Sequence, residues 1–172
     1  MKKKLFAAWL LLVALVCAQA ADQKPQKGKL SRITPALVER FEGVITLQDG
    51  SEKDIEGIAF YFEISKINKQ SQYLTISELR DFLIEGKSYA QLTKDDFGTE
   101  IEPDTEILSS ADLIEEEPEL KKKLKDKKKG FVMKTLIYGS PLPESGIVRV
   151  TLNVGWDSEM EAFDFAFNLA DL

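Results

Sequence analysis

The stretch that decides the fold runs from residue 148 to residue 169 and reads VRVTLNVGWDSEMEAFDFAFNL. Apolar residues recur here at every second position, and successive side chains of a β-strand point to opposite faces. The first half sets one apolar face against a polar one: Val148, Val150, Leu152, Val154 and Trp156 against Arg149, Thr151 and Asn153. The second half does the same: Phe163, Phe165, Phe167 and Leu169 against Ala162, Asp164, Ala166 and Asn168. With a turn at Asp157-Ser158-Glu159 between them, the pattern predicts a hairpin with one buried face.

The neighbouring segments continue the β pattern. Residues 131–138 are rich in strand formers, and residues 139–146 form a proline-containing loop that cannot continue a ladder. The last forty residues therefore predict three successive antiparallel strands. Near the start, residues 44–47 and 58–64 flank Asp49-Gly50, which predicts a second strand pair with a turn between.

Residues 73–84 support two interpretations. Thr75 and Glu78 have the spacing of a capping box, which would begin a short helix ended by Gly86. Alternatively, the segment is a strand that turns at residues 85–87 and returns as a strand at Tyr89 to Leu92. The strand is favoured because strands are expected on both sides of it.

The predicted fold is an all-β antiparallel sandwich, immunoglobulin-like in the broad sense, with around seven short strands and a possible short helical insertion. The cysteine and tryptophan spacing of true immunoglobulin domains is missing, so the resemblance is architectural only. A small β-barrel is the alternative fold. Residues 36–172 form the sandwich domain. Residues 21–35 are polar and lysine-rich and carry Pro25 and Gly28, so we expect a flexible tether.

Residues 1–20 have the features of a secretory signal peptide. Three lysines precede an apolar stretch from Leu5 to Cys17, and Ala18-Gln19-Ala20 has the small-x-small form of a cleavage site. The apolar run is shorter than the roughly 20 residues that a bilayer span requires, so we expect no membrane span in the mature chain. The sequence predicts export to the periplasm or beyond. Lipid attachment at Cys17, which would anchor the protein to a membrane, is the alternative.

The composition excludes most familiar catalytic chemistry. The chain contains no histidine, and its one cysteine is Cys17, within the predicted signal. A serine triad, a cysteine protease, a zinc site and a redox dithiol each depend on those residues. The formal charge of −6 becomes −9 without the signal, because three lysines leave and the 29 acidic residues remain. Such an acidic body disfavours nucleic acid. We predict no catalytic residues, no cofactor and no enzyme activity.

Two acid-based alternatives stay open. Residues 95–106 carry oxygen ligands of the kind that calcium accepts: Asp95, Asp96, Glu100, Glu102, Asp104 and Glu106. The spacing does not fit an EF-hand loop, and the alternation of acids from Glu100 to Ile107 is typical of the solvent face of a strand, so we predict no metal site. A pair of carboxylates could also hydrolyse glycosides without histidine, but the sequence identifies no such pair.

The candidate binding site is a lysine run that follows the acidic stretch 115–119. Its residues are Lys121, Lys122, Lys123, Lys125, Lys127, Lys128 and Lys129. Pro118 suits a first helical turn and Gly130 a helix end, and Glu117 and Glu119 precede Lys121 and Lys123 by four residues, so a protruding helix is expected. The alternative is a solvated appendage.

From these features we predict a non-catalytic exported module that binds an envelope protein or an anionic polymer. A calcium- or small-ligand-binding protein is the second hypothesis, and a hydrolase that uses carboxylates alone is the third. Trp156 continues the apolar face of its strand, so we expect a core residue, with a ligand platform as the alternative.

Overall fold

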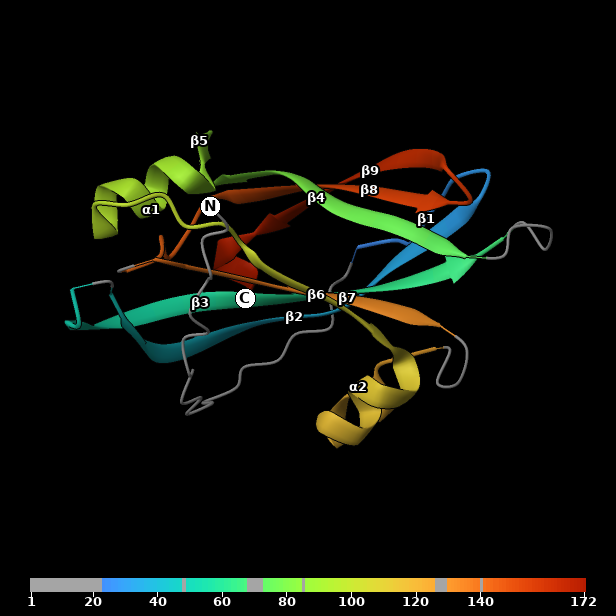
Figure 1. Ribbon diagram of the computed structural model, residues 1–172, viewed down its shortest axis with the longest axis horizontal. Coiled ribbons are helices and arrows are strands. Elements are labelled where there is room, and N and C mark those ends of the chain that lie inside the picture. The colour runs from blue at the N-terminus through green and yellow to red at the C-terminus, as the bar shows by residue number, and fades with distance from the viewer. Residues whose placement is uncertain (1–22, 48, 68–72, 85, 126–129, 140) are drawn as a thin grey trace, which may run out of the picture.

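The fold consists of two antiparallel sheets in two layers, seen in a computed structural model that describes residues 23–47, 49–67, 73–84, 86–125, 130–139 and 141–172 (Figure 1). The five-stranded sheet has the order β1 (Gln26–Lys27), β2 (Ser31–Thr46), β3 (Glu52–Lys66), β7 (Phe131–Gly139), β6 (Asp104–Ser109). The four-stranded sheet has the order β5 (Lys87–Ser88), β4 (Leu74–Ile84), β8 (Ile147–Trp156), β9 (Glu159–Asn168). In the described part of the chain neither sheet closes on itself, so the small barrel is wrong.

The predicted hairpin at residues 148–169 is confirmed. Strands β8 and β9 pair from Ile147–Asn168 to Trp156–Glu159, and the two residues between them, Asp157 and Ser158, both have positive φ. Two positive φ values give a tight turn whose twist matches that of the flanking strands. The strand pair near the start is also confirmed, because β2 and β3 pair along their length around the turn at Asp49-Gly50.

The core between the sheets is mainly aromatic and branched aliphatic. Phe60 and Phe62 of β3 face Phe167 and Phe165 of β9, with ring centroids 5.2 Å apart in each pair. All four side chains are buried. Trp156 lies in the same core, where its Nε1 donates a hydrogen bond to Ser31 Oγ at 2.7 Å, so the core interpretation of Trp156 is confirmed.

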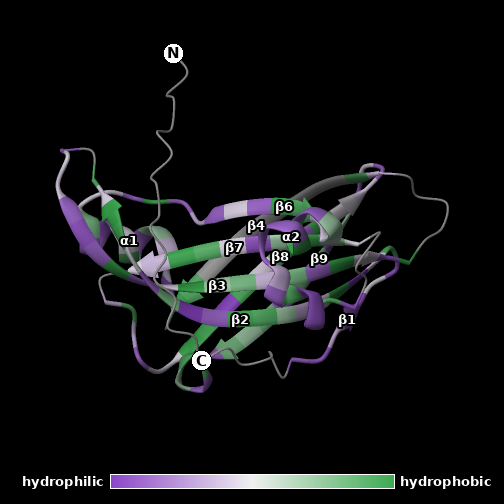
Figure 2. Cartoon of the chain, turned by 90° about the horizontal axis from the view of Figure 1, so that it is seen from below, coloured by the Kyte–Doolittle hydropathy of each residue, from purple (hydrophilic) through white to green (hydrophobic). Residues whose placement is uncertain are grey.

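A second, smaller core lies on the outer side of the five-stranded sheet. Ile55, Ala59 and Tyr61 of β3 point to this side and are buried, although strand alternation alone predicts an exposed face there. Tyr61 lies beside α2 (Ser110–Glu116) and η1 (Pro118–Lys122), a 3-10 helix, whose Leu113 and Leu120 belong to the same core. Figure 2 shows α2 in front of the sheet. Strand β3 is therefore buried on both faces.

The structure confirms one prediction in the middle of the chain and corrects another. Residues 74–84 form the favoured strand, but residues 89–97 form the helix α1 (Tyr89–Phe97) and not a returning strand. Ser88 accepts a hydrogen bond from the N–H of Gln91, and Gly98 ends the helix with φ 72°. The three strands expected in the last forty residues are present as β7, β8 and β9, with β7 in the five-stranded sheet and β8 and β9 paired in the other.

Part of the expected tether belongs to the sheet. Residues 26, 27 and 31–35, which the sequence places in a flexible segment, lie in β1 and β2, and Leu30 between them is buried. The physical reason is a long-range contact, since the carboxylate of Glu161 on β9 accepts hydrogen bonds from the N–H groups of Leu30 and Ser31. The predicted signal peptide, with Cys17, lies outside the described residues.

Candidate functional site

The described part of the lysine run, Lys121 to Lys125, lies beside α2, on the outer side of the five-stranded sheet. We call residues 117–125 the lysine segment. Its side chains Lys121, Lys122, Lys123 and Lys125 are exposed, whereas Lys127, Lys128 and Lys129 lie outside the described residues. Four of the seven predicted site residues are therefore placed together on one surface segment.

Two leucines anchor the lysine segment to the sheet. Leu120 is 1% exposed and Leu124 is 2% exposed, and both join Leu113 of α2 in the outer core. Between them stand three consecutive lysines. Because an exposed 3-10 turn of this length has little stability of its own, the buried leucines hold it in place. The lysines are thus presented on a fixed part of the fold.

The prediction of a single helix that runs from Pro118 toward Gly130 is wrong. Pro118 does begin η1, but η1 covers only Pro118–Lys122, with Leu120 N–H bonded to Glu117 O and Lys123 N–H bonded to Leu120 O. Beyond η1, the N–H of Leu124 bonds to Leu120 O at 3.0 Å, which brings the two anchoring leucines to the same side of the segment. Glu117 also has a different partner from the Lys121 that the spacing suggests.

Glu117 lies between α2 and η1 and connects both to the five-stranded sheet. It ends α2 and precedes η1. Its Oε2 accepts a hydrogen bond from the Tyr61 hydroxyl at 2.9 Å, and its Oε1 is paired with Lys134 Nζ. Lys134 also lies over the Tyr61 ring, 5.6 Å from its centroid. Burial, followed by the negative charge of Glu117, raises the pKa of Tyr61, so its hydroxyl keeps the proton that it donates.

The sequence analysis missed Tyr61 and Lys134 as supports of this segment. The available signal was Lys134 itself, a charged residue inside the otherwise apolar or neutral strand Phe131–Gly139. A lysine at such a position needs a carboxylate partner, because an unpaired charge is costly when half-buried. The sequence alone does not say which of the many acids supplies it.

Glu63 makes a further attachment. Its side chain is buried, at 1% exposure, and its Oε2 accepts a hydrogen bond from the backbone N–H of Lys125 at 3.2 Å. A buried carboxylate that accepts from the backbone ties the end of the lysine segment to β3 and leaves the side chain of Lys125 exposed.

Glu39 makes the site sensitive to pH. Burial, then the negative charges of Glu117 and Glu119, raises the pKa of Glu39 above its ordinary value of 4.5, while Lys134 and the Tyr61 hydroxyl oppose the shift. The folded state therefore holds this proton more tightly than the unfolded state does. The associated stability is present at low pH and is lost as the pH rises through the raised pKa.

We expect Glu39→Gln to raise the melting temperature at pH 7, because the amide removes a half-buried negative charge beside Glu117. Near pH 4, where the carboxyl is already protonated, the effect should be much smaller. Thermal unfolding at both pH values measures the difference. Glu42→Gln, an exposed residue on the same strand, is the matched control, and equal effects of the two substitutions would contradict this account of Glu39.

The acids of residues 95–106 do not gather around one point. Asp95 lies 3.6 Å from Lys87 Nζ, and Glu100 lies 3.2 Å from Lys94 Nζ. Asp104 and Glu106 belong to β6, where Glu106 pairs in register with Lys134. Among the residues that the structure describes, no three acids form a group able to hold a metal ion.

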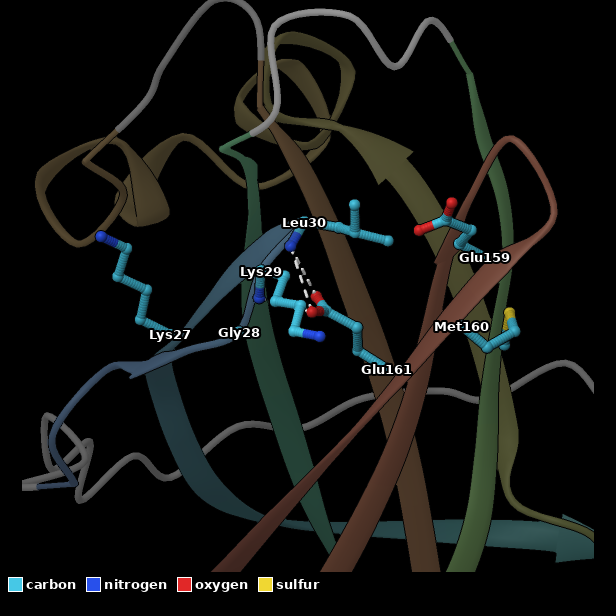
Figure 3. Close-up of a pocket in the computed structure, with 7 residues that line it drawn as sticks. All are labelled: Lys27, Gly28, Lys29, Leu30, Glu159, Met160 and Glu161. Carbon is cyan, nitrogen blue, oxygen red and sulfur yellow. Dashed lines mark hydrogen bonds between the residues drawn. The ribbon is translucent and has the colours of Figure 1, made fainter.

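A cleft of about 600 Å³ opens at another place, along the seam between the two sheets. It is lined by Lys27, Gly28, Lys29, Leu30, Glu159, Met160 and Glu161. Figure 3 shows Glu161 pointing from β9 toward the backbone of residues 28–30. A Cβ on Gly28 would lie 2.6 Å from the Glu161 carboxylate, so a larger residue at this position would displace the carboxylate from its present place.

Comparison with protein-family models, with curated proteins and with solved structures finds no match to this chain. No helix in the described ranges is long and apolar enough to cross a membrane.

Proposed function

We propose that this chain is a non-catalytic exported binding module whose lysine segment docks on an acidic surface of another cell-envelope protein. The main observation that supports the proposal is that the segment bearing the lysines is anchored to the sheet by buried side chains. Lys121, Lys122 and Lys123 are exposed between two leucines that are almost fully buried, Leu120 and Leu124. A solvated appendage does not need such anchors, whereas a docking surface gains affinity when its charges are held in place before binding.

The electrostatics support a protein surface over a single small anion. The residues of a 3-10 helix are about 120° apart, so consecutive lysines point in different directions and do not converge on one point. The rest of the chain is strongly acidic, and the formal charge is −6 even with the signal lysines counted. A local excess of lysines on such a body orients a partner that carries acidic side chains on its surface.

The strand order supports an immunoglobulin-like sandwich as the scaffold. Leaving aside the two-residue strands β1 and β5, the sheets have the orders β2-β3-β7-β6 and β4-β8-β9. Lettered A to G along the chain, these are the orders ABED and CFG of the constant-type immunoglobulin fold. This architecture serves many binding proteins, and it carries no function by itself. Export is proposed from the sequence of residues 1–20 alone.

A charge-removal experiment tests the proposal. The variant Lys121→Gln, Lys122→Gln, Lys123→Gln should lose crosslinked capture of the partner from the source cell envelope, with the melting temperature nearly unchanged. Capture by the unaltered protein should weaken steeply with salt, because exposed charges are screened beyond about 8 Å at physiological ionic strength.

The matched control removes the same charge elsewhere. Lys66→Gln, Lys87→Gln, Lys94→Gln changes three lysines that are exposed outside the lysine segment, and it should leave capture intact. If both triple variants capture the partner equally well, the lysine segment is not the docking surface. Recovery of a protease-resistant, phosphate-bearing polymer in place of a protein would also overturn the proposal, in favour of an anionic polymer.

A further inference from the structure

Strand β9 lies at one edge of the four-stranded sheet. Among the described residues, side chains and not a neighbouring strand contact the backbone at this edge. In the part of the chain that the structure describes, β9 pairs only with β8. We call residues 23–30 the N-terminal strap. Its glutamines Gln26 and Gln23 donate hydrogen bonds from their side-chain amides to the carbonyl oxygens of Asp164 and Ala166. Glu161 adds the reciprocal contact to the backbone of the strap.

These contacts identify which backbone groups of β9 point outward. In an antiparallel strand the N–H and C=O of one residue point to the same side, and the side alternates from residue to residue. Because the carbonyls of Asp164 and Ala166 face the strap, the N–H and C=O of Ala162 face the same way. The outward edge therefore offers a row of backbone donors and acceptors at residues 162, 164 and 166.

The strap forms hydrogen bonds with only some of these outward backbone groups. Two glutamine side chains reach two carbonyl oxygens, and each is a single hydrogen bond at a surface that is exposed or half-buried. Farther along, residues 27–30 of the strap and residues 159–161 line the cleft of about 600 Å³, and the side chain of Glu161 bonds to the backbone of the strap there (Figure 3). An extended peptide segment bound in the same place would form pairs of backbone hydrogen bonds with β9 along this edge.

The charges at this edge indicate which kind of extended segment could bind there. The strap that now lies there is rich in lysine and glutamine, with Lys24, Lys27 and Lys29 among its eight residues. The strand that it covers carries exposed acids, Glu159 and Asp164, and the half-buried Glu161. An acidic or apolar segment would be a poor match, whereas a basic extended segment complements this edge.

We propose that β9 is a docking edge for an extended, lysine- or arginine-bearing segment of a partner protein, which adds as a further strand and displaces the glutamine contacts of the N-terminal strap. This surface is separate from the lysine segment, which carries charge of the opposite sign and lies on the other sheet. The two proposals can therefore fail independently.

The test uses a fluorescent peptide of alternating threonine and lysine, with a threonine and glutamate peptide as its control. Gln23→Ala, Gln26→Ala should bind the lysine peptide about tenfold more tightly than the unaltered chain, because the competing strap is weakened. Binding should protect the amide hydrogens of residues 162, 164 and 166 from exchange. Equal binding of the two peptides, or protection elsewhere, would overturn the proposal.

Ala162→Pro provides the decisive variant. Proline removes an outward N–H and leaves the ladder to β8 intact, which is where a strand tolerates proline. This substitution should abolish binding of the lysine peptide, while Ala162→Thr, which keeps the N–H, should not. Lys121→Gln, Lys122→Gln, Lys123→Gln should bind the peptide normally. If Ala162→Pro binds as well as Ala162→Thr, β9 is not the docking edge. If Gln23→Ala, Gln26→Ala instead forms dimers in sedimentation, the occupant is a second copy.

Discussion

Phe165→Ala is expected to lower the free energy of unfolding by about 3–5 kcal/mol. The Phe165 side chain is 2% exposed, and its ring lies 5.2 Å from that of Phe62 and 6.4 Å from that of Phe167, centroid to centroid. Truncation to alanine removes the ring from the centre of the aromatic core and leaves a cavity that the two sheets cannot close. A loss of this size is a large share of the stability of an ordinary domain, about 5–15 kcal/mol. Urea denaturation at equilibrium measures it.

Thr151→Ala is the control for this prediction. Thr151 lies on the opposite face of the same hairpin, where its hydroxyl donates a hydrogen bond to Asp164 at 2.6 Å. Loss of one such exposed bond should cost about 1 kcal/mol or less. Similar losses at positions 151 and 165 would contradict the assignment of the two faces.

Leu120→Ala is expected to release the lysine segment from the sheet. The side chain of Leu120 is 1% exposed in the outer core, and leucine-to-alanine changes at buried positions cost about 2–5 kcal/mol. The segment is short and packs through few side chains, so we expect the loss to appear as local opening before global unfolding. Trypsin, which cleaves after lysine, reports this opening directly. Cleavage after Lys121, Lys122 and Lys123 should be at least about tenfold faster, since about 1.4 kcal/mol corresponds to a factor of ten.

Leu30→Ala is the matched control for local opening. Leu30 is also buried but belongs to the core between the sheets, away from the lysine segment. Its substitution should reduce overall stability without selective cleavage at the lysine segment. Unchanged cleavage in Leu120→Ala would mean that Leu113, Leu124 and Glu117 suffice to hold the segment.

The sequence predicted those parts of the fold in which local pattern and final structure agree. The β8–β9 hairpin is one example, because each strand alternates cleanly and only two residues form the turn. The helix α1 is the opposite case. Its start and end signals, Ser88 and Gly98, are present in the sequence, but its apolar face has only Tyr89, Leu92 and Phe97, with the polar Thr93 buried among them. Strand formers such as Tyr89 then favoured the wrong interpretation.

The candidate site was predictable in composition and not in geometry. A lysine run is visible in any sequence, and four of the predicted lysines are indeed exposed together. Their attachment depends on residues far along the chain. Tyr61 lies 56 positions before Glu117, and Glu63 lies 62 positions before Lys125. The N-terminal strap shows the same limit, since Glu161, which holds it, lies about 130 residues away.

The contact between Glu161 and the N-terminal strap also has a consequence for the timing of folding. It joins residues that are 131 positions apart, close to the two ends of the chain. Local hairpins can form as soon as their residues are available, but contacts of such long range form slowly. The seam cannot close until the last strand has been synthesised. If the chain is exported as proposed, it can therefore remain incompletely folded while it crosses the membrane. It completes its structure only after β9 has crossed.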